Sequence, residues 1–161
     1  MIGRIIFFIF LILQPFIGNA ALGNLNTKNR TWYTKLKQSP LTPPPIVFPI
    51  VWTILYILLG LSAVFFLMGR SLLPNLVSYI APYEAQMLLN FSWSVVFFGL
   101  QKPKASLVII FAMIALTAYL LWFTWRKDRL AFGMLLPYFV WILFAMYLNF
   151  YIVIKNKDKS S

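Results

Sequence analysis

The chain contains no cysteine and no histidine, and only three of its 161 residues are acidic: Glu84, Asp128 and Asp158. Without cysteine, a disulfide framework, a zinc site built on thiolates and a thiol nucleophile are excluded. Without histidine, the chain lacks the commonest general base and metal ligand, and the usual proximal ligand of haem iron. The absences exclude most conventional hydrolytic and metal-dependent enzymes, and we predict no metal site.

Charged residues of any kind are also scarce, because they make up 11% of the chain while apolar residues make up 61%. A soluble domain has roughly 25% charged and 45–50% apolar residues. No soluble core is large enough to bury this excess of apolar surface, so lipid must cover it. The composition therefore predicts an integral membrane protein.

Five apolar stretches approach the length of about 20 residues that a membrane-spanning helix requires. They predict an all-α fold, a single domain over residues 1–161 that is a bundle of five transmembrane helices joined mostly by short connections. The predicted helices and the long first loop have these ranges: 5–22, 46–68, 76–100, 105–125 and 130–154, with the loop over 23–45.

The first stretch has two interpretations. Arg4, the run Ile5–Leu13 and the small residues Gly18-Asn19-Ala20 fit a signal peptide cleaved after Ala20. The apolar run continues past Pro15, however, which favours a retained helix.

The net charge of +11 comes from basic residues that lie between the apolar stretches or at the chain ends. This placement indicates loop charges that set topology, and we expect no nucleic-acid partner. One side of the membrane receives five basic residues, and the other, with the long loop and the C-terminus, receives nine. The positive-inside rule then predicts a cytoplasmic C-terminus.

The loop 23–45 contains interfacial aromatic residues, Trp32 and Tyr33, followed by three consecutive prolines, Pro43–Pro45. Consecutive prolines favour a stiff, polyproline-like segment. Such a segment is either a rigid cover for the mouth of the bundle or an ordinary connector with interfacial anchors.

Polar residues inside the apolar stretches indicate which helix faces avoid lipid. Gln86, Asn90, Trp93 and Phe97 follow one another at steps of four, three and four, so they share one face of the third predicted helix. Similar stripes occur on the second and fifth helices, and contain these residues: Trp52, Tyr56 and Gly60; Tyr138, Trp141, Ala145 and Leu148, with Asn149 beside them. The stripes fit helix packing first of all, and the alternative is a pocket for a flat apolar ligand.

These stripes also belong to motifs that resemble the translocator protein family, which is also known as the tryptophan-rich sensory proteins or peripheral-type benzodiazepine receptors. The matching motifs appear in order between residues 32 and 149, and are as follows: Trp32-Tyr33-x-x-Leu36; Thr42-Pro43-Pro44; Val51-Trp52-Thr53-Ile54-Leu55-Tyr56; Gln86-x-x-Leu89-Asn90-x-x-Trp93; Leu136-Pro137-Tyr138-x-x-Trp141; Ala145-x-x-Leu148-Asn149.

The resemblance implies a bundle, usually a homodimer, whose pocket is closed by the first loop and binds tetrapyrroles such as protoporphyrin IX, haem-like tetrapyrroles, sterols or synthetic aromatic ligands. It implies no required cofactor and, for this chain, a bacterial cell membrane. By position, the implied ligand-binding residues are Tyr33, Trp52, Asn90, Trp93, Ser94, Trp141, Ala145 and Leu148. The chain departs from the family pattern at Ser39, where proline is usual, and at Leu41 and Ile46, where tryptophans often stand.

Three functions follow as alternatives. The first is a membrane receptor or carrier for a tetrapyrrole or a similar ligand. The second is photochemical porphyrin breakdown, which would use Trp52 and Trp141 because no conventional catalytic groups are available. The third is a structural or regulatory membrane protein with no ligand of its own.

Overall fold

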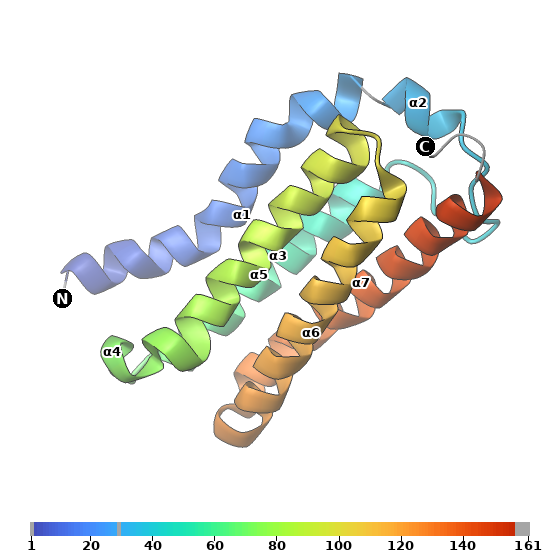
Figure 1. Ribbon diagram of the computed structural model, residues 1–161. Helices are drawn as coiled ribbons and strands as arrows, with labels where there is room; N and C mark the ends of the chain where they lie inside the picture. Colours follow the sequence, from blue (N-terminus) through green and yellow to red (C-terminus); the bar gives the residue numbers. More distant parts are fainter. Residues whose placement is uncertain (1, 29, 157–161) are drawn as a thin grey trace.

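The computed structural model describes residues 2–28 and 30–156, and within these ranges it describes all side chains except those of residues 19, 21–28 and 30. Lys157, Asp158 and Lys159, which contribute to the charge pattern above, lie outside the described residues. The described ranges consist of helices joined by turns and loops, and they contain no strand. The prediction of an all-α membrane bundle is confirmed (Figure 1).

The connections between the helices are short, apart from residues 35–46 between α2 and α3. Their bounds are α1 Ile2–Lys28, α2 Arg30–Thr34, α3 Val47–Leu67, α4 Leu72–Asn75, η1 Leu76–Ile80, α5 Ala81–Ser94, η2 Val95–Gly99, α6 Pro103–Lys127 and α7 Arg129–Lys155. The segments α4, η1, α5 and η2 follow one another directly, so the chain is helical from Leu72 to Gly99. η1 and η2 are π-helical turns.

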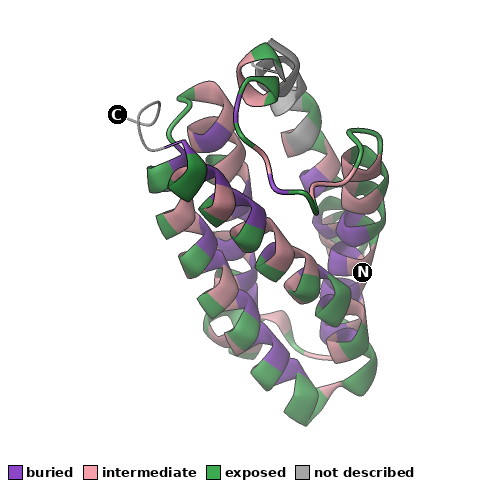
Figure 2. Ribbon diagram, turned by 90° about the vertical axis from the view of Figure 1, so that its right-hand side faces the viewer, coloured by how far each residue is buried: buried purple, intermediate pink, exposed green. Residues whose placement is uncertain are grey.

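Three helices, α3, α6 and α7, are each long and apolar enough to cross a bilayer, and α1 contains a shorter apolar stretch, Ile2–Gly18. Figure 2 shows that exposed residues recur along the outer faces of the helices. Large apolar side chains such as Phe111 and Val140 are more than half exposed. Without lipid this surface would face water at a high cost in free energy.

In two places the helices extend beyond the predicted ranges. Residues 23–45 are not all loop, because α1 continues to Lys28 and α2 occupies Arg30–Thr34. The third helical segment begins at Leu72 rather than at residue 76. In both places the chain stays helical beyond the apolar run, since hydropathy marks the bilayer core and not the end of hydrogen-bonded backbone.

Prolines inside the helices explain two contacts between helices. A proline cannot donate a hydrogen bond to the carbonyl four residues earlier. The carbonyl oxygen of Leu11, four residues before Pro15, accepts a hydrogen bond from the Tyr83 hydroxyl at 3.3 Å. The carbonyl of Ser78, four residues before Pro82, similarly accepts the Tyr119 hydroxyl at 2.9 Å. Tyrosines of other helices thus supply donors that the prolines lack, which matters where no water is present.

Close packing brings α1 against α3. A methyl group at Gly60 would lie 2.8 Å from the Cα atom of Ile12 in α1. At the same end as the N-terminus, the Arg4 guanidinium donates to the backbone carbonyls of Leu67 and Arg70, and Arg70 forms a 3.1 Å ion pair with Asp128. These contacts join α1, α3 and the turn between α6 and α7.

Candidate ligand-binding site

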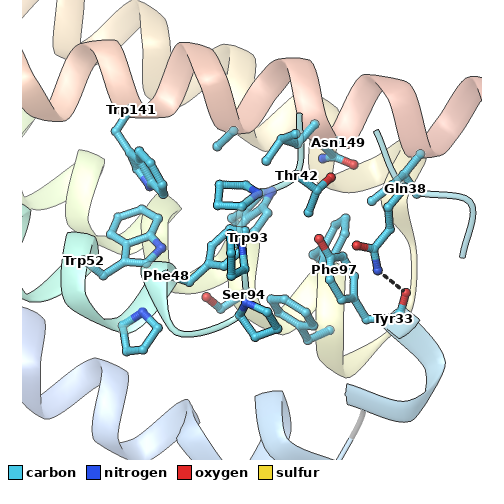
Figure 3. A pocket seen from close by; sticks show the side chains of 18 of the residues that line it. Tyr33, Gln38, Thr42, Phe48, Trp52, Trp93, Ser94, Phe97, Trp141 and Asn149 are labelled. Atoms are coloured by element: carbon cyan, nitrogen blue, oxygen red, sulfur yellow. Dashed lines mark hydrogen bonds between the residues drawn. The ribbon is translucent and has the colours of Figure 1, made fainter. Parts of the chain in front are cut away.

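A cavity of about 710 Å³ lies between α3, the α5–η2 segment and α7, beneath the segment 35–46 that precedes α3. Figure 3 shows Trp52, Trp93 and Trp141 around one part of it and Tyr33 and Gln38 towards the loop. Pocket volumes for small ligands are about 300–1,000 Å³, so the cavity has room for a drug-sized molecule.

Indole rings form much of the wall. Trp52 of α3 and Trp141 of α7 meet edge to face, with ring centroids 6.4 Å apart and planes at 87°. Trp93 of α5 stacks on Phe97, one helical turn on, at 5.0 Å and 17°. Indole rings from three helices therefore border the same space, and such rings pack well against flat ligands.

Seven of the eight residues that the sequence implies line this cavity: Tyr33, Trp52, Trp93, Ser94, Trp141, Ala145 and Leu148. Asn90 is not among the lining residues. It is buried beside the cavity, where its Oδ1 accepts the Tyr56 hydroxyl at 3.0 Å and its Nδ2 donates to the Tyr138 hydroxyl at 3.0 Å. Gln86 donates to the same Tyr138 oxygen. Asn90 therefore positions the tyrosines that pack against Trp52, and does not itself face the cavity.

Several lining residues were missed, including Gln38, Thr42, Phe48 and Asn149. Asn149 carried a signal, since it is an amide inside an apolar stretch and directly follows Leu148 in a motif. Its Nδ2 donates to Ser106 Oγ at 2.8 Å, and that hydroxyl donates to the Pro103 carbonyl. Gln38 carried no signal, because only the folded loop brings it to the cavity.

The segment 35–46 is held over the cavity by side chains of α7 and of Asn156, the residue that follows it, and we call residues 35–46 the lid. Asn156 accepts the Lys37 N–H at 2.9 Å and donates to the Lys37 carbonyl at 3.1 Å. The Ser39 hydroxyl lies 2.9 Å from the Tyr147 hydroxyl. Ser39, where the family usually has proline, thus makes a bond that proline cannot make.

Aromatic contacts fix the helix that leads into the lid. The Tyr33 ring meets Phe97 and Phe98 at 6.1 and 5.8 Å, and its backbone carbonyl accepts Gln38 Nε2 at 3.0 Å. Burial raises the pKa of the Tyr33 hydroxyl above its ordinary value, so this group is neutral at physiological pH.

No charged residue is among those that line the cavity, and the described residues contain no group of three or more His, Cys, Asp or Glu side chains. The cavity can therefore offer ring faces, hydroxyl groups and amides to a ligand. It offers neither a general base nor a charged partner from its walls.

Comparison with known proteins gives one consistent result. A model of the TspO/MBR family matches residues 10–154. The chain is 37% identical over 127 residues to the tryptophan-rich protein TspO of Archaeoglobus fulgidus, covering 79% of this chain and 81% of that protein. It is 39% identical over 132 residues to the protein of the same name in Chlorobaculum tepidum, covering 80% and 82%. It is 32% identical over 142 residues to the tryptophan-rich sensory protein of Cereibacter sphaeroides, covering 88% and 87%.

Proposed function

Because the chain belongs to the TspO/MBR family, and because indoles of three helices line one cavity, we propose that it is a membrane receptor or carrier for a flat, largely apolar ligand. A tetrapyrrole such as protoporphyrin IX is the ligand class that we favour. The observation that carries the proposal is the convergence of Trp52, Trp93 and Trp141 on that cavity. Stacking on several ring faces suits a wide conjugated ring better than a small polar metabolite.

The charge distribution suggests an orientation for the ligand. Because no lining residue is charged, the carboxylates of a porphyrin would be poorly stabilised inside the cavity. Lys35 and Lys37 are exposed and are sequence neighbours of the lining residues Thr34 and Gln38. The macrocycle would then lie between the indoles, with its carboxylates near these lysines.

The test is a titration of the detergent-purified protein with protoporphyrin IX in the dark, followed by tryptophan fluorescence. We expect saturable binding with a Kd in the micromolar range or tighter, roughly −8 kcal/mol. Ala145→Phe places a ring in the cavity and should weaken binding at least ten-fold. Ala118→Phe is the matched control, because Ala118 is exposed on α6 and is not among the lining residues.

A second pair of variants tests the indoles themselves. Trp141→Phe should weaken binding, whereas Trp122→Phe, at an exposed position outside the cavity, should not. Linear, unsaturable quenching in all proteins would mean that porphyrin only partitions into detergent. The ligand-free structural role would then replace this proposal. If one cholesterol molecule displaced each bound protoporphyrin molecule, a sterol-like ligand would be indicated instead.

Photochemical porphyrin breakdown is a second candidate, favoured by the contact between Trp52 and Trp141 at the cavity wall. Both rings would lie against a bound porphyrin, where an indole can be oxidised by an excited ligand or by activated oxygen. The expected signature is loss of the porphyrin Soret absorption only under light, abolished in Trp141→Phe. Bleaching at the same rate without protein would reject an enzymatic role.

The orientation in the membrane completes the proposal. We place the lid and the C-terminus in the cytoplasm of a bacterial cell, on the charge count of nine against five. Because the chain has no cysteine, single cysteines can be introduced and labelled without background. A membrane-impermeant thiol reagent added to intact cells should label Ser71→Cys and leave Lys102→Cys unlabelled. The reverse pattern would invert the orientation.

A further inference from the structure

The turn between α6 and α7 carries three basic side chains, Arg126, Lys127 and Arg129, around one acid, Asp128. The acid is already engaged. One Asp128 carboxylate oxygen pairs with Arg70 at 3.1 Å, and the other accepts a backbone N–H of α7 at 3.0 Å. In the part of the chain that the structure describes, the three turn cations pair with no carboxylate. Figure 1 shows this turn at one end of the bundle. Three uncompensated positive charges therefore lie at that end.

Two of these cations are guanidinium groups held over indole rings. The guanidinium carbon of Arg126 lies 4.9 Å from the ring centroid of Trp122, and that of Arg129 lies 3.1 Å from the ring centroid of Trp125. Trp122 and Trp125 are 53% and 48% exposed, so the rings also form part of the outer surface of the bundle. The two pairs are neighbours, because the tryptophans are three residues apart on α6.

This geometry leaves the hydrogen-bonding edges of both guanidinium groups available. A guanidinium that lies over a ring uses its face, and the N–H donors in its plane still point outwards. Those donors match the oxygen atoms of a phosphate group and can bind two of them at once. The adjoining indoles are typical of the membrane interface, where one edge meets headgroups and the other meets acyl chains.

We infer that the α6–α7 turn binds an acidic phospholipid. The Arg126 and Arg129 guanidinium groups donate to its phosphate oxygens, and the Trp122 and Trp125 rings border the start of its acyl chains. A lipid fits better than a soluble anion, because the rings that position both arginines are on the exposed, lipid-facing surface of one membrane helix, α6.

The opposite end of the bundle lacks this arrangement among the described side chains. The described cationic side chains at that end are lysines, and the one that lies over a ring, Lys155 over Tyr151, is 5.9 Å from the centroid. Lys102 and Lys104 lie at this other end, in the connection to α6 and in its first turn, and both are exposed. They provide a control in which two positive charges can be removed away from the proposed site.

The test uses the full chain in nanodiscs of phosphatidylcholine that contain a small fraction of either phosphatidylglycerol or phosphatidylcholine with brominated acyl chains. Bromine quenches nearby indoles, so quenching by the two lipids reports their relative occupancy near Trp122 and Trp125. We expect a preference for phosphatidylglycerol of about five-fold per contributing cation. The double substitution Trp122→Phe and Trp125→Phe should remove the preferential signal, which assigns it to this site.

The combined change Arg126→Gln and Arg129→Gln should abolish the preference, and Lys102→Gln with Lys104→Gln should leave it intact. Arg126→Lys with Arg129→Lys keeps the charge but loses the planar donors, and should give a clearly smaller preference than the native chain. Full preference in the lysine variant, or equal loss in the Lys102 and Lys104 control, would overturn the inference. So would displacement of the lipid by millimolar inorganic phosphate, which would indicate a site for a soluble anion. Unfolding temperatures of all variants check that each one is folded.

Discussion

The lid is fastened by Asn156, and removing this side chain is the most direct test of the site as described. Its amide makes two hydrogen bonds to the backbone of Lys37, at 2.9 and 3.1 Å, and a third to the carbonyl of Ile152 within α7. Asn156→Ala deletes both bonds to the lid. The N–H and the carbonyl of Lys37 then lose their protein partners and are free to exchange with water.

The expected loss in the free energy that holds the lid closed follows from the number of hydrogen bonds that Asn156→Ala removes. Each hydrogen bond contributes about 0.5–1.5 kcal/mol net, so two contribute about 1–3 kcal/mol to the closed lid. The equilibrium constant for opening should rise roughly 5- to 150-fold, since 1.4 kcal/mol corresponds to a factor of ten. The Ser39–Tyr147 bond and the ring contacts of Tyr33 remain, so the lid should open more often without detaching from the bundle.

Hydrogen–deuterium exchange of the peptide that spans residues 36–42 measures this directly and needs no ligand. Exchange there should accelerate in Asn156→Ala by the same factor, while α6 and α7 exchange as before. Asn75→Ala is the matched control, because Asn75 bonds only to the Ser71 carbonyl, four residues earlier, at the opposite end. Unchanged exchange of residues 36–42 in Asn156→Ala would refute the assignment of this residue as the fastening of the lid.

Three further predictions concern stability, measured as the midpoint of thermal unfolding in detergent. Gly60→Ala should destabilise by about 1–3 kcal/mol because its methyl group would meet the α1 backbone at 2.8 Å, whereas Gly133→Ala, with no atom within 4 Å, should be neutral or stabilising. Asp128→Ala removes a helix cap and the Arg70 partner and should cost about 1–2 kcal/mol, with Asp128→Asn recovering most of it; equal losses in the two variants would contradict the capping role. Tyr138→Phe leaves the buried amide of Asn90 without its acceptor and should cost about 1–3 kcal/mol, so a stability equal to the native chain would contradict the buried network.

The membrane helices could be predicted from sequence because one strong physical effect determines them. The second predicted helix, 46–68, differs from α3, Val47–Leu67, by one residue at each end. The apolar run ends sharply there, at Pro45 and Gly69, so hydropathy and backbone geometry agree. At α1 the two signals disagree, because the helix continues through a polar stretch to Lys28 that hydropathy assigns to a loop.

The cavity residues were less predictable, and Asn90 shows why. Helical spacing correctly places Asn90 on the inner face of its helix together with Trp93. Periodicity gives the face of a helix and does not give the neighbour that meets each residue on that face. Tyr56 and Tyr138 approach Asn90 from α3 and α7, and their hydroxyl groups occupy both ends of its amide. That arrangement depends on how three helices pack together, and the residue spacing along one helix carries no information about this packing.

The lid contacts are the least predictable part, since their partners are 108 and 119 residues apart in the chain. They also differ in kind from the contacts at the other end of the bundle. There, Arg4 and Arg70 tie α1, α3 and the α6–α7 turn together through charged groups and an ion pair. At the lid, neutral hydrogen bonds join one loop to one helix.

Charge-assisted bonds are about twice as strong as neutral ones, so local opening should begin at the lid and leave the arginine end closed. A ligand that reaches the indoles of the cavity should therefore enter from the lid side. A reducible bifunctional thiol cross-linker that joins Ser39→Cys in the lid to Tyr147→Cys in α7 should slow its binding and release until the linker is reduced. Binding rates that do not change on reduction would instead indicate entry between the helices from the lipid.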